Sequence, residues 1–154
     1  MTDAPVPTLT RSFHVEVELG PLEDHGMTRV GHRRVVPIVG GTVSGELEGV
    51  LLPGGADWQI VRPDGAIEVD ATYTARTSTG GFVLIHARGL RSGPPEVLEA
   101  LLRGEQVSSD AYTFRTAVTL ESSDPELAWT QQSLFLASAV RGADTVSYTA
   151  YRVG

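Results

Sequence analysis

The residues available for acid–base chemistry are few, because the chain contains no lysine and no cysteine. Schiff-base chemistry, thiolate nucleophiles and thiolate metal sites are therefore excluded. Proton transfer must use a carboxylate, a histidine or a tyrosine, and an arginine or a tyrosine hydroxyl must stabilise charge that develops on an oxygen. The candidate catalytic residues that we assign to these roles are Asp57, Asp70, Tyr73, Arg115 and Glu121.

Aromatic side chains could form the walls of a pocket for a ligand. Trp58 stands near an expected strand start, where it could pack in the core or line the mouth of a barrel. Some candidates have a structural role as the alternative to a chemical one: Asp57 could cap a turn, and Arg115 could form a surface ion pair. The candidate ligand-binding residues are Trp58, His86, Phe114 and Trp129.

The four histidines show no spacing typical of a metal site. None forms an HxH, HxxxH or HExxH pattern, so a site would have to be assembled across strands, for example from His14 or His86 with Glu16 or Asp70. Glycine-rich residues 40–45 lack the strand–GxGxxG–helix context of a phosphate cradle. We expect no metal and no cofactor.

Alternation along the expected strands sorts the candidates into two faces. Asp70 and Tyr73 are three residues apart and therefore face opposite sides of a strand. Arg115 shares a face with Glu121, whereas Phe114 faces the other way. The simplest expectation places Asp70 in solvent and Tyr73 in the core, but a polar barrel interior would leave either face able to line a pocket.

The elements that carry these residues are mainly strands. Strict alternation over residues 13–19 predicts a half-buried strand. Residues 22–29 are expected to form an exposed loop, and Pro37 is expected to mark an edge or a strand end. The other expected strands cover residues 35–39, 42–51, 58–62, 67–74, 82–88, 113–121, 131–139 and 146–153.

One helix is expected at residues 96–103, after Pro94 and Pro95 and before Gly104, outside the barrel or capping an end. About eight or more strands with internal glycines favour an all-β fold, a closed antiparallel β-barrel with one short helix. A two-sheet sandwich is the alternative. We predict a single domain over residues 1–154, with residues 1–10 as a loosely ordered tail.

The composition of the chain argues against two classes of partner, nucleic acids and membranes. Nineteen acidic and twelve basic residues give a net charge of −7, which argues against nucleic acid. No apolar run approaches the roughly 20 residues of a membrane span, and the N-terminus does not resemble a signal peptide. The absence of cysteine fits the cytoplasm. The absence of both lysine and asparagine indicates a GC-rich genome, and we expect an actinobacterium.

Several motifs in order resemble the domain-of-unknown-function 3237 family of small bacterial and fungal proteins. The resemblance runs from about residue 31 to residue 153. It rests on residues 31–34 (GHRR), 37–42 (PIVGGT), 49–58 (GVLLPGGADW), 62–65 (RPDG), 70–73 (DATY) and 112–115 (YTFR). Two departures are Ser78-Thr79-Gly80 where the family usually has Asp-Asp-Gly, and Trp129-Thr130-Gln131 where it usually has Trp-Leu-Asn.

The resemblance implies a closed barrel similar to those of allene oxide cyclase and dirigent proteins, and a homodimer. It also implies a mode of action in which a cavity holds a reactive intermediate and steers its cyclisation or isomerisation without a cofactor. Asp57 and Arg115 lie in the stretches that most resemble the family.

Three functional hypotheses remain. The first is a cofactor-independent cyclase, isomerase or lyase acting on a small, largely apolar biosynthetic intermediate. The second is a barrel that binds a small ligand without catalysis, and the third is a structural barrel filled by its own side chains. A buried carboxylate with a raised pKa beside tyrosine or arginine would favour the enzyme, whereas a purely apolar pocket would favour the binding protein.

Overall fold

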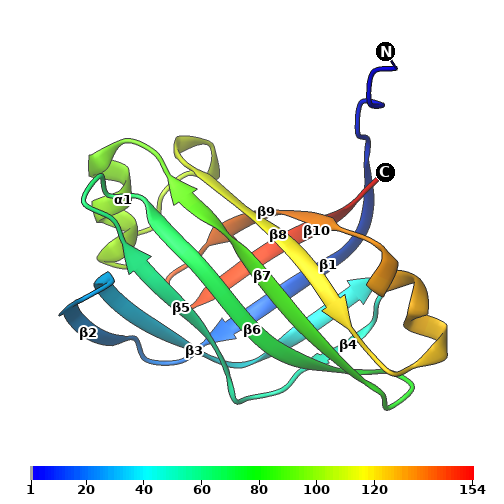
Figure 1. The fold of residues 1–154 in the computed structure, drawn as a ribbon. Helices are drawn as coiled ribbons and strands as arrows, with labels where there is room; N and C mark the ends of the chain where they lie inside the picture. Colours follow the sequence, from blue (N-terminus) through cyan, green and yellow to red (C-terminus); the bar gives the residue numbers. More distant parts are fainter. Residues whose placement is uncertain (1) are drawn as a thin grey trace.

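Ten strands form a single sheet in the computed structural model, which describes residues 2–154. Short helical segments connect some of the strands, and residues 2–8 precede the first strand (Figure 1). The elements are β1 (Leu9–Leu19), β2 (Glu23–Thr28), β3 (Gly31–Gly45), β4 (Gly49–Leu51), β5 (Gly55–Val61), β6 (Ile67–Thr77), β7 (Phe82–Ser92), α1 (Pro95–Leu102), η1 (Ser109–Ala111), β8 (Thr113–Glu121), η2 (Pro125–Gln132), β9 (Phe135–Arg141) and β10 (Thr145–Val153).

The sheet closes because β1 pairs with both β10 and β3. From β1 the ring passes through β10, β9, β8, β7 and β6, and then both β5 and β4 join β6 to β3. The result is a closed antiparallel barrel of eight strands with two extra strands. This confirms the predicted fold class, and the sandwich alternative is wrong.

Strand β3 is longer than the sequence indicated. It runs through Gly40 and Gly41, which we had placed between two strands, and its end pairs with β4 only at residues 42–43. At Gly41 the chain has φ +141°, and a Cβ atom would lie 2.0 Å from the carbonyl oxygen of Glu16. Only glycine lets β3 approach β1 this closely.

Pro37 lies inside β3 and not at a strand end or edge. Its carbonyl accepts a hydrogen bond from the backbone N–H of Gly20 (2.8 Å). In an antiparallel strand the nitrogen of a residue faces the same side as its carbonyl. The nitrogen of Pro37 therefore faces the connection between β1 and β2, where no ladder bond is required.

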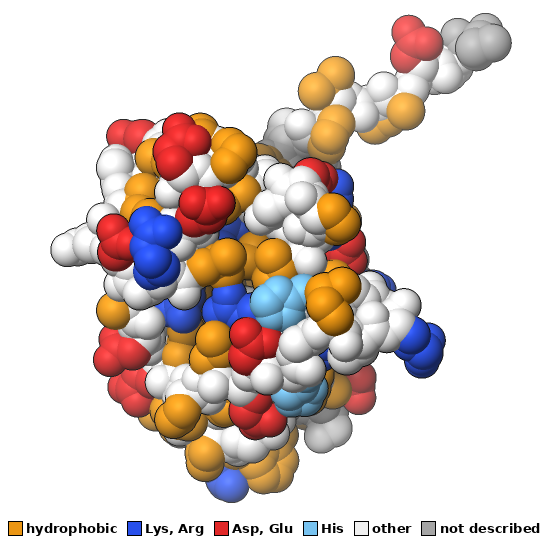
Figure 2. All heavy atoms as spheres, turned by 90° about the vertical axis from the view of Figure 1, so that its left-hand side faces the viewer, with side chains coloured by type: hydrophobic (Ala, Val, Ile, Leu, Met, Phe, Trp, Pro, Cys, Tyr) orange, Lys and Arg blue, Asp and Glu red, His pale blue; other side chains and the backbone are white. Residues whose placement is uncertain are grey.

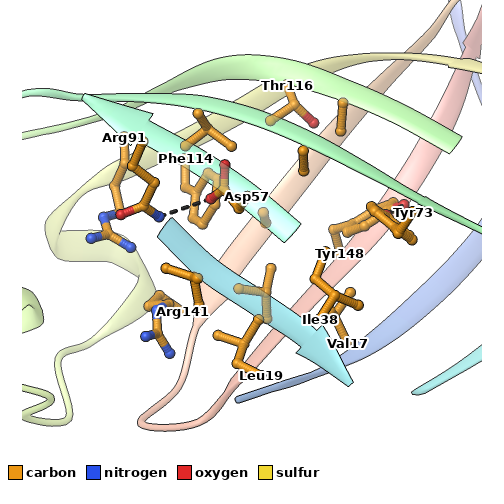
Figure 3. A pocket seen from close by; sticks show the side chains of 17 residues that line it. Val17, Leu19, Ile38, Asp57, Tyr73, Arg91, Phe114, Thr116, Arg141 and Tyr148 are labelled. Atoms are coloured by element: carbon orange, nitrogen blue, oxygen red, sulfur yellow. Dashed lines mark hydrogen bonds between the residues drawn. The ribbon is translucent and has the colours of Figure 1, made fainter. Parts of the chain in front are cut away.

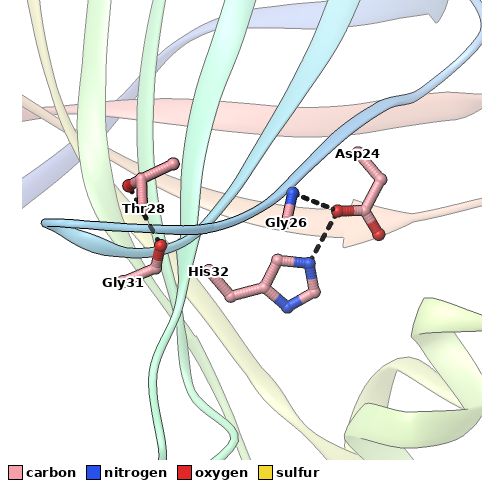
Figure 4. Close-up of polar contacts among 5 residues, drawn as sticks. All are labelled: Asp24, Gly26, Thr28, Gly31 and His32. Atoms are coloured by element: carbon pink, nitrogen blue, oxygen red, sulfur yellow. Dashed lines mark hydrogen bonds and ion pairs between the residues drawn. The ribbon is translucent and has the colours of Figure 1, made fainter.

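The polar stretch expected to be a loop contains strand β2, which pairs with β3. Side-chain contacts hold this hairpin (Figure 4). Asp24 accepts hydrogen bonds from the backbone N–H of Gly26 (2.9 Å) and contacts the ring of His32 (2.8 Å). Thr28 donates to the carbonyl of Gly31 (3.1 Å). Alternation of apolar residues could not reveal β2, because β2 is mostly exposed.

The two ends of the barrel differ (Figure 1). At one end lies η2, drawn in orange, which includes residues 131–132 that we had assigned to a strand. Here Trp129 and Phe13 pack edge-to-face on Phe135, with ring centroids 6.2 and 5.3 Å away. Aromatic side chains therefore fill the interior at this end.

At the other end lies α1, one residue offset from the predicted helix. Pro95 occupies its first turn, and Leu98 and Leu101 are buried in the core. The helix thus covers part of this end and leaves the centre of the barrel accessible. Figure 2 faces this end and shows arginine side chains inside a hollow, bordered by hydrophobic, acidic and histidine side chains.

Candidate functional site

A cavity of about 50 Å³ lies inside the barrel between the hollow end and the aromatic end. Aliphatic side chains from many strands form most of its wall, among them Val17, Ile38 and Val69. Polar side chains stand at its two ends (Figure 3). They are Asp57, Gln59, Arg91 and Arg141 at the hollow end and Tyr73 and Tyr148 at the inner end, and the hydroxyl-bearing Thr116 lies in the wall between them.

Asp57 is a buried carboxylate on β5, only 9% exposed. Gln59 Nε2 donates to its Oδ2 atom (2.8 Å), and the backbone N–H of Asp70 donates to its Oδ1 atom (3.0 Å). Burial raises the pKa of the Asp57 carboxyl above its usual value, although both hydrogen bonds act in the opposite direction. Asp57 is therefore held in place and shifted toward the pH range in which it can exchange a proton.

Three arginines face the hollow end from different strands: Arg34 on β3, Arg91 on β7 and Arg141 on β9. Arg91 is 2% exposed and lies over the ring of Phe114, 5.7 Å from its centroid. Burial, reinforced by the positive charges of Arg141 and Arg34, lowers the pKa of Arg91 to about 10. Burial also lowers the pKa of Arg34 and of Arg141.

Tyr73 on β6 and Tyr148 on β10 share a hydrogen bond between their hydroxyls across the barrel. Burial raises the pKa of both phenols, so both stay protonated at neutral pH. Two hydroxyls carry two hydrogens, and the bond between them uses one. The other hydrogen is free to be donated to a group in the cavity.

The structure brings only some of the predicted residues together. Asp57, Tyr73 and Phe114 line the cavity. Phe114 does so beneath Arg91, so it supports that guanidinium. Alternation predicted a core position for Tyr73 and put Phe114 on the face of its strand opposite to Arg115, and the structure shows that both faces point inward.

Four other candidates face outward and do not reach the cavity. Asp70 contacts His86 on the outer surface, with His86 Nε2 2.9 Å from Asp70 Oδ1. Arg115 is exposed and donates to the carbonyl of Phe114 (3.0 Å), and Glu121 is exposed on the same face of β8. Alternation explains all four placements, because each follows or precedes a buried neighbour on its strand. Asp70 does contribute its backbone N–H to Asp57.

The two tryptophans also lie away from the cavity. Trp58 is 43% exposed on the outside of β5, because its neighbours Asp57 and Gln59 take the inward positions. Trp129 lies in η2 at the opposite end, where Arg152 stacks 5.4 Å from its ring centroid. The two departures from the family pattern, at residues 78–80 and 129–131, also lie outside the cavity lining.

Sequence reasoning missed Arg91, Arg141, Gln59 and Tyr148. Arg91 could have been found from strand alternation, because Val83, Ile85, Ala87 and Gly89 occupy the inward positions of β7 and Arg91 occupies the next one. The same signal held for Arg141, which continues the inward series Phe135, Ala137, Ala139. A charged residue in phase with a buried series near a strand end predicts a polar barrel mouth.

Within residues 2–154, no group of three histidine, aspartate or glutamate side chains is placed to hold a metal ion. No helix in that part of the chain is long and apolar enough to span a membrane.

The chain is similar to proteins over almost its whole length. A UPF0311 protein of Bradyrhizobium diazoefficiens is 38% identical over 149 residues, which cover 96% of this chain and 98% of that protein. The crystal structure of a conserved protein of unknown function from Rhodopseudomonas palustris superposes with a TM-score of 0.92 at 38% identity, covering 99% of this chain and 100% of that one.

A more distant structural neighbour is described as an enzyme from Penicillium herquei. It superposes with a TM-score of 0.73 at 18% identity and covers 100% of both chains, which shows a shared fold. The relatives come from other bacterial groups, among them Clostridium acetobutylicum, so the actinobacterial source stays a prediction. The sequence also matches the family described as "Protein of unknown function (DUF3237)" over residues 7–153, and the chain therefore belongs to this family.

Proposed function

We propose that this barrel is a cofactor-independent enzyme that performs acid–base chemistry on a small molecule held in its interior cavity. The observation that carries the proposal is Asp57, a buried carboxylate with a raised pKa at one end of a cavity whose other end holds a tyrosine pair. A site that only stored an apolar ligand would need neither group. The fold shared with an enzyme of Penicillium herquei is consistent with catalysis.

The reaction classes that this arrangement suits are isomerisation, cyclisation and lyase chemistry. In an isomerisation, the Asp57 carboxylate takes a proton from a carbon next to a carbonyl, and the electron pair of the broken C–H bond moves onto the carbonyl oxygen. The free hydroxyl hydrogen of the Tyr73–Tyr148 pair stabilises that oxygen. Return of the proton from Asp57 to a different carbon completes the reaction and restores the carboxylate.

The alternative is a barrel that binds a small ligand without changing it. The aliphatic wall of the cavity would serve such a role equally well. The two functions differ in what they need from Asp57, because binding of an apolar group does not depend on a proton donor or acceptor.

Incubation with a metabolite extract of the source organism, followed by liquid chromatography and mass spectrometry, separates the two functions. The enzyme converts a component into an isomer of equal mass or into fragments that sum to it. Asp57→Asn slows that conversion at least about tenfold, equivalent to about 1.4 kcal/mol in the barrier. Glu121→Gln, on the outer face of β8, leaves it unchanged. A component that is retained unchanged and equally by the parent and by Asp57→Asn would establish the binding protein instead.

A further inference from the structure

The hollow end of the cavity holds an excess of buried positive charge. Arg34, Arg91 and Arg141 lie close enough to influence one another, and Asp57 is the buried carboxylate beside them. The chain as a whole carries a net charge of −7, so the sign of this cluster is opposite to that of the whole chain. Burial of like charges is costly unless a partner neutralises them.

Asp57 does not satisfy these cations through hydrogen bonds. Its two oxygens accept from Gln59 and from the backbone of Asp70. The Nε and Nη1 atoms of Arg91 and the Nε atom of Arg34 are buried without a hydrogen-bond partner among the described residues. A buried donor without a partner destabilises the folded chain, and a charged donor does so more strongly.

Arg91 is fixed in place at the wall of the cavity. Its side chain is almost fully buried, lines the cavity and rests on the ring of Phe114. Arg141 is oriented by the turn after β9, because its Nη1 atom donates to the carbonyls of Gly142 and Ala143. Both guanidinium groups appear at the same end of the cavity in Figure 3.

We infer that Arg91 and Arg141, supported by Arg34, form a subsite for the carboxylate of a short organic acid, whose chain extends toward the Tyr73–Tyr148 pair. A carboxylate is planar and matches the two parallel donors of a guanidinium. The mainly aliphatic wall of the cavity contacts the hydrocarbon chain of such an acid, and inorganic phosphate has no such chain. This inference rests on the proposed function for its context and names the substrate class of the same cavity.

The size of the cavity limits the acid. A volume of about 50 Å³ holds three or four water-sized groups. The part of the ligand between the arginines and the tyrosines is therefore short, and anything longer must extend out through the hollow end. This replaces the expected largely apolar intermediate with an anionic one whose chain alone is apolar.

Titration of the isotope-labelled protein by NMR with butanoate, butanamide and inorganic phosphate tests the subsite. Butanoate binds in the cavity at least about tenfold more tightly than butanamide, a difference of about 1.4 kcal/mol. Arg91→Met and Arg141→Met each weaken butanoate binding by at least that factor. The matched control Arg115→Met, which changes an exposed arginine on the outer face of β8, leaves it unchanged.

Equal binding of butanamide and butanoate would overturn the inference, as would tighter binding of phosphate or unchanged butanoate binding by a folded Arg91→Met. Asp57→Asn distinguishes this failure from that of the proposed function. This variant keeps butanoate binding, because it removes a negative charge beside the subsite. Butanoate binding without any Asp57-dependent conversion would contradict the proposed enzyme function and support the carboxylate subsite. Conversion of a neutral metabolite without butanoate binding would support the enzyme function and contradict the subsite.

Discussion

Asp57 and Arg91 line the same cavity, yet no hydrogen bond joins them. Gln59 and the backbone of Asp70 occupy the carboxylate, and the guanidinium is left with two buried atoms that have no partner in the described part of the chain. An internal ion pair would have neutralised both groups. Their separation leaves a buried carboxylate with a raised pKa and an unsatisfied cation, two features that favour the proposed reactive site.

Arg91→Met is expected to stabilise the protein. Burial lowers the pKa of Arg91 to about 10, so the side chain stays charged at neutral pH and the burial of this charge destabilises the folded state. Replacing the buried cation by a side chain of similar length should raise the free energy of unfolding by about 1–3 kcal/mol. Denaturant unfolding at pH 7 measures this, with Arg115→Met as a control that changes little. A destabilised Arg91→Met would show that the guanidinium holds the barrel together.

Asp57 is expected to make stability fall as pH rises. Because its pKa is raised above 3.8 in the folded state, the folded chain binds more protons than the unfolded chain between 3.8 and the folded pKa. The contribution of Asp57 is present in full below this range and is lost as pH rises through it. The slope for one proton is at most about 1.4 kcal/mol per pH unit.

Unfolding measured from pH 4 upward for the parent and for Asp57→Asn tests this dependence. The stability of Asp57→Asn relative to the parent should improve as pH increases. A difference that stays constant or changes in the opposite sense would mean that the carboxyl is not shifted upward.

The hydrogen bond between Tyr73 and Tyr148 is expected to couple the two residues energetically. Tyr73→Phe or Tyr148→Phe leaves a buried hydroxyl without its partner and should cost about 1 kcal/mol each. The double variant should cost less than the sum of the two, by about 0.5 kcal/mol or more. A double-mutant cycle by denaturant unfolding measures the coupling, with Tyr151→Phe as a control. Additive costs would show that the hydroxyls act independently.

Homodimerisation stays a prediction. Three features favour it in the sequence: the family resemblance, the net charge of −7 and an expected short strand at residues 35–39. The third feature is wrong, because residues 35–39 are part of the fifteen-residue strand β3. The structure adds β2, which pairs only with β3 among the described residues and so has an open edge. Light scattering at micromolar concentration should give twice the 16.4 kDa of one chain. A single-chain mass at all concentrations would contradict it.

The faces of the long strands could be predicted from the sequence. Alternation separated Tyr73 from Asp70 and Phe114 from Arg115, and the simplest expectation put Tyr73 in the core and Asp70 in solvent. The structure confirms this separation, because a closed barrel gives each strand one interior face, and it places Phe114 inside and Arg115 outside. Arg115 was assigned to the site because it lies in a family-like stretch, and Asp70 because proton transfer requires a carboxylate, a histidine or a tyrosine. Alternation was the better guide to their location.

The mouth of the barrel could not be predicted in the same way. Around Trp58 the polar Asp57 and Gln59 point inward and the large apolar residue points outward, which inverts the usual hydrophobic pattern. Arg91 follows Gly89, whose missing side chain interrupts the series that would have marked the arginine as buried. Strand β2 was missed because no apolar face defines it.

The central claim is that Asp57 takes a proton from a short acid held in the cavity and returns it. Proton NMR of 2-oxobutanoate in deuterated water tests it most directly, by following exchange of the hydrogens at C3, the carbon beside the carbonyl. The parent protein should accelerate this exchange above the rate in buffer, and Asp57→Asn should slow it at least about tenfold, while Glu121→Gln leaves it unchanged. Exchange at the buffer rate in the presence of the parent protein, under conditions in which butanoate occupies the cavity, would contradict the claim.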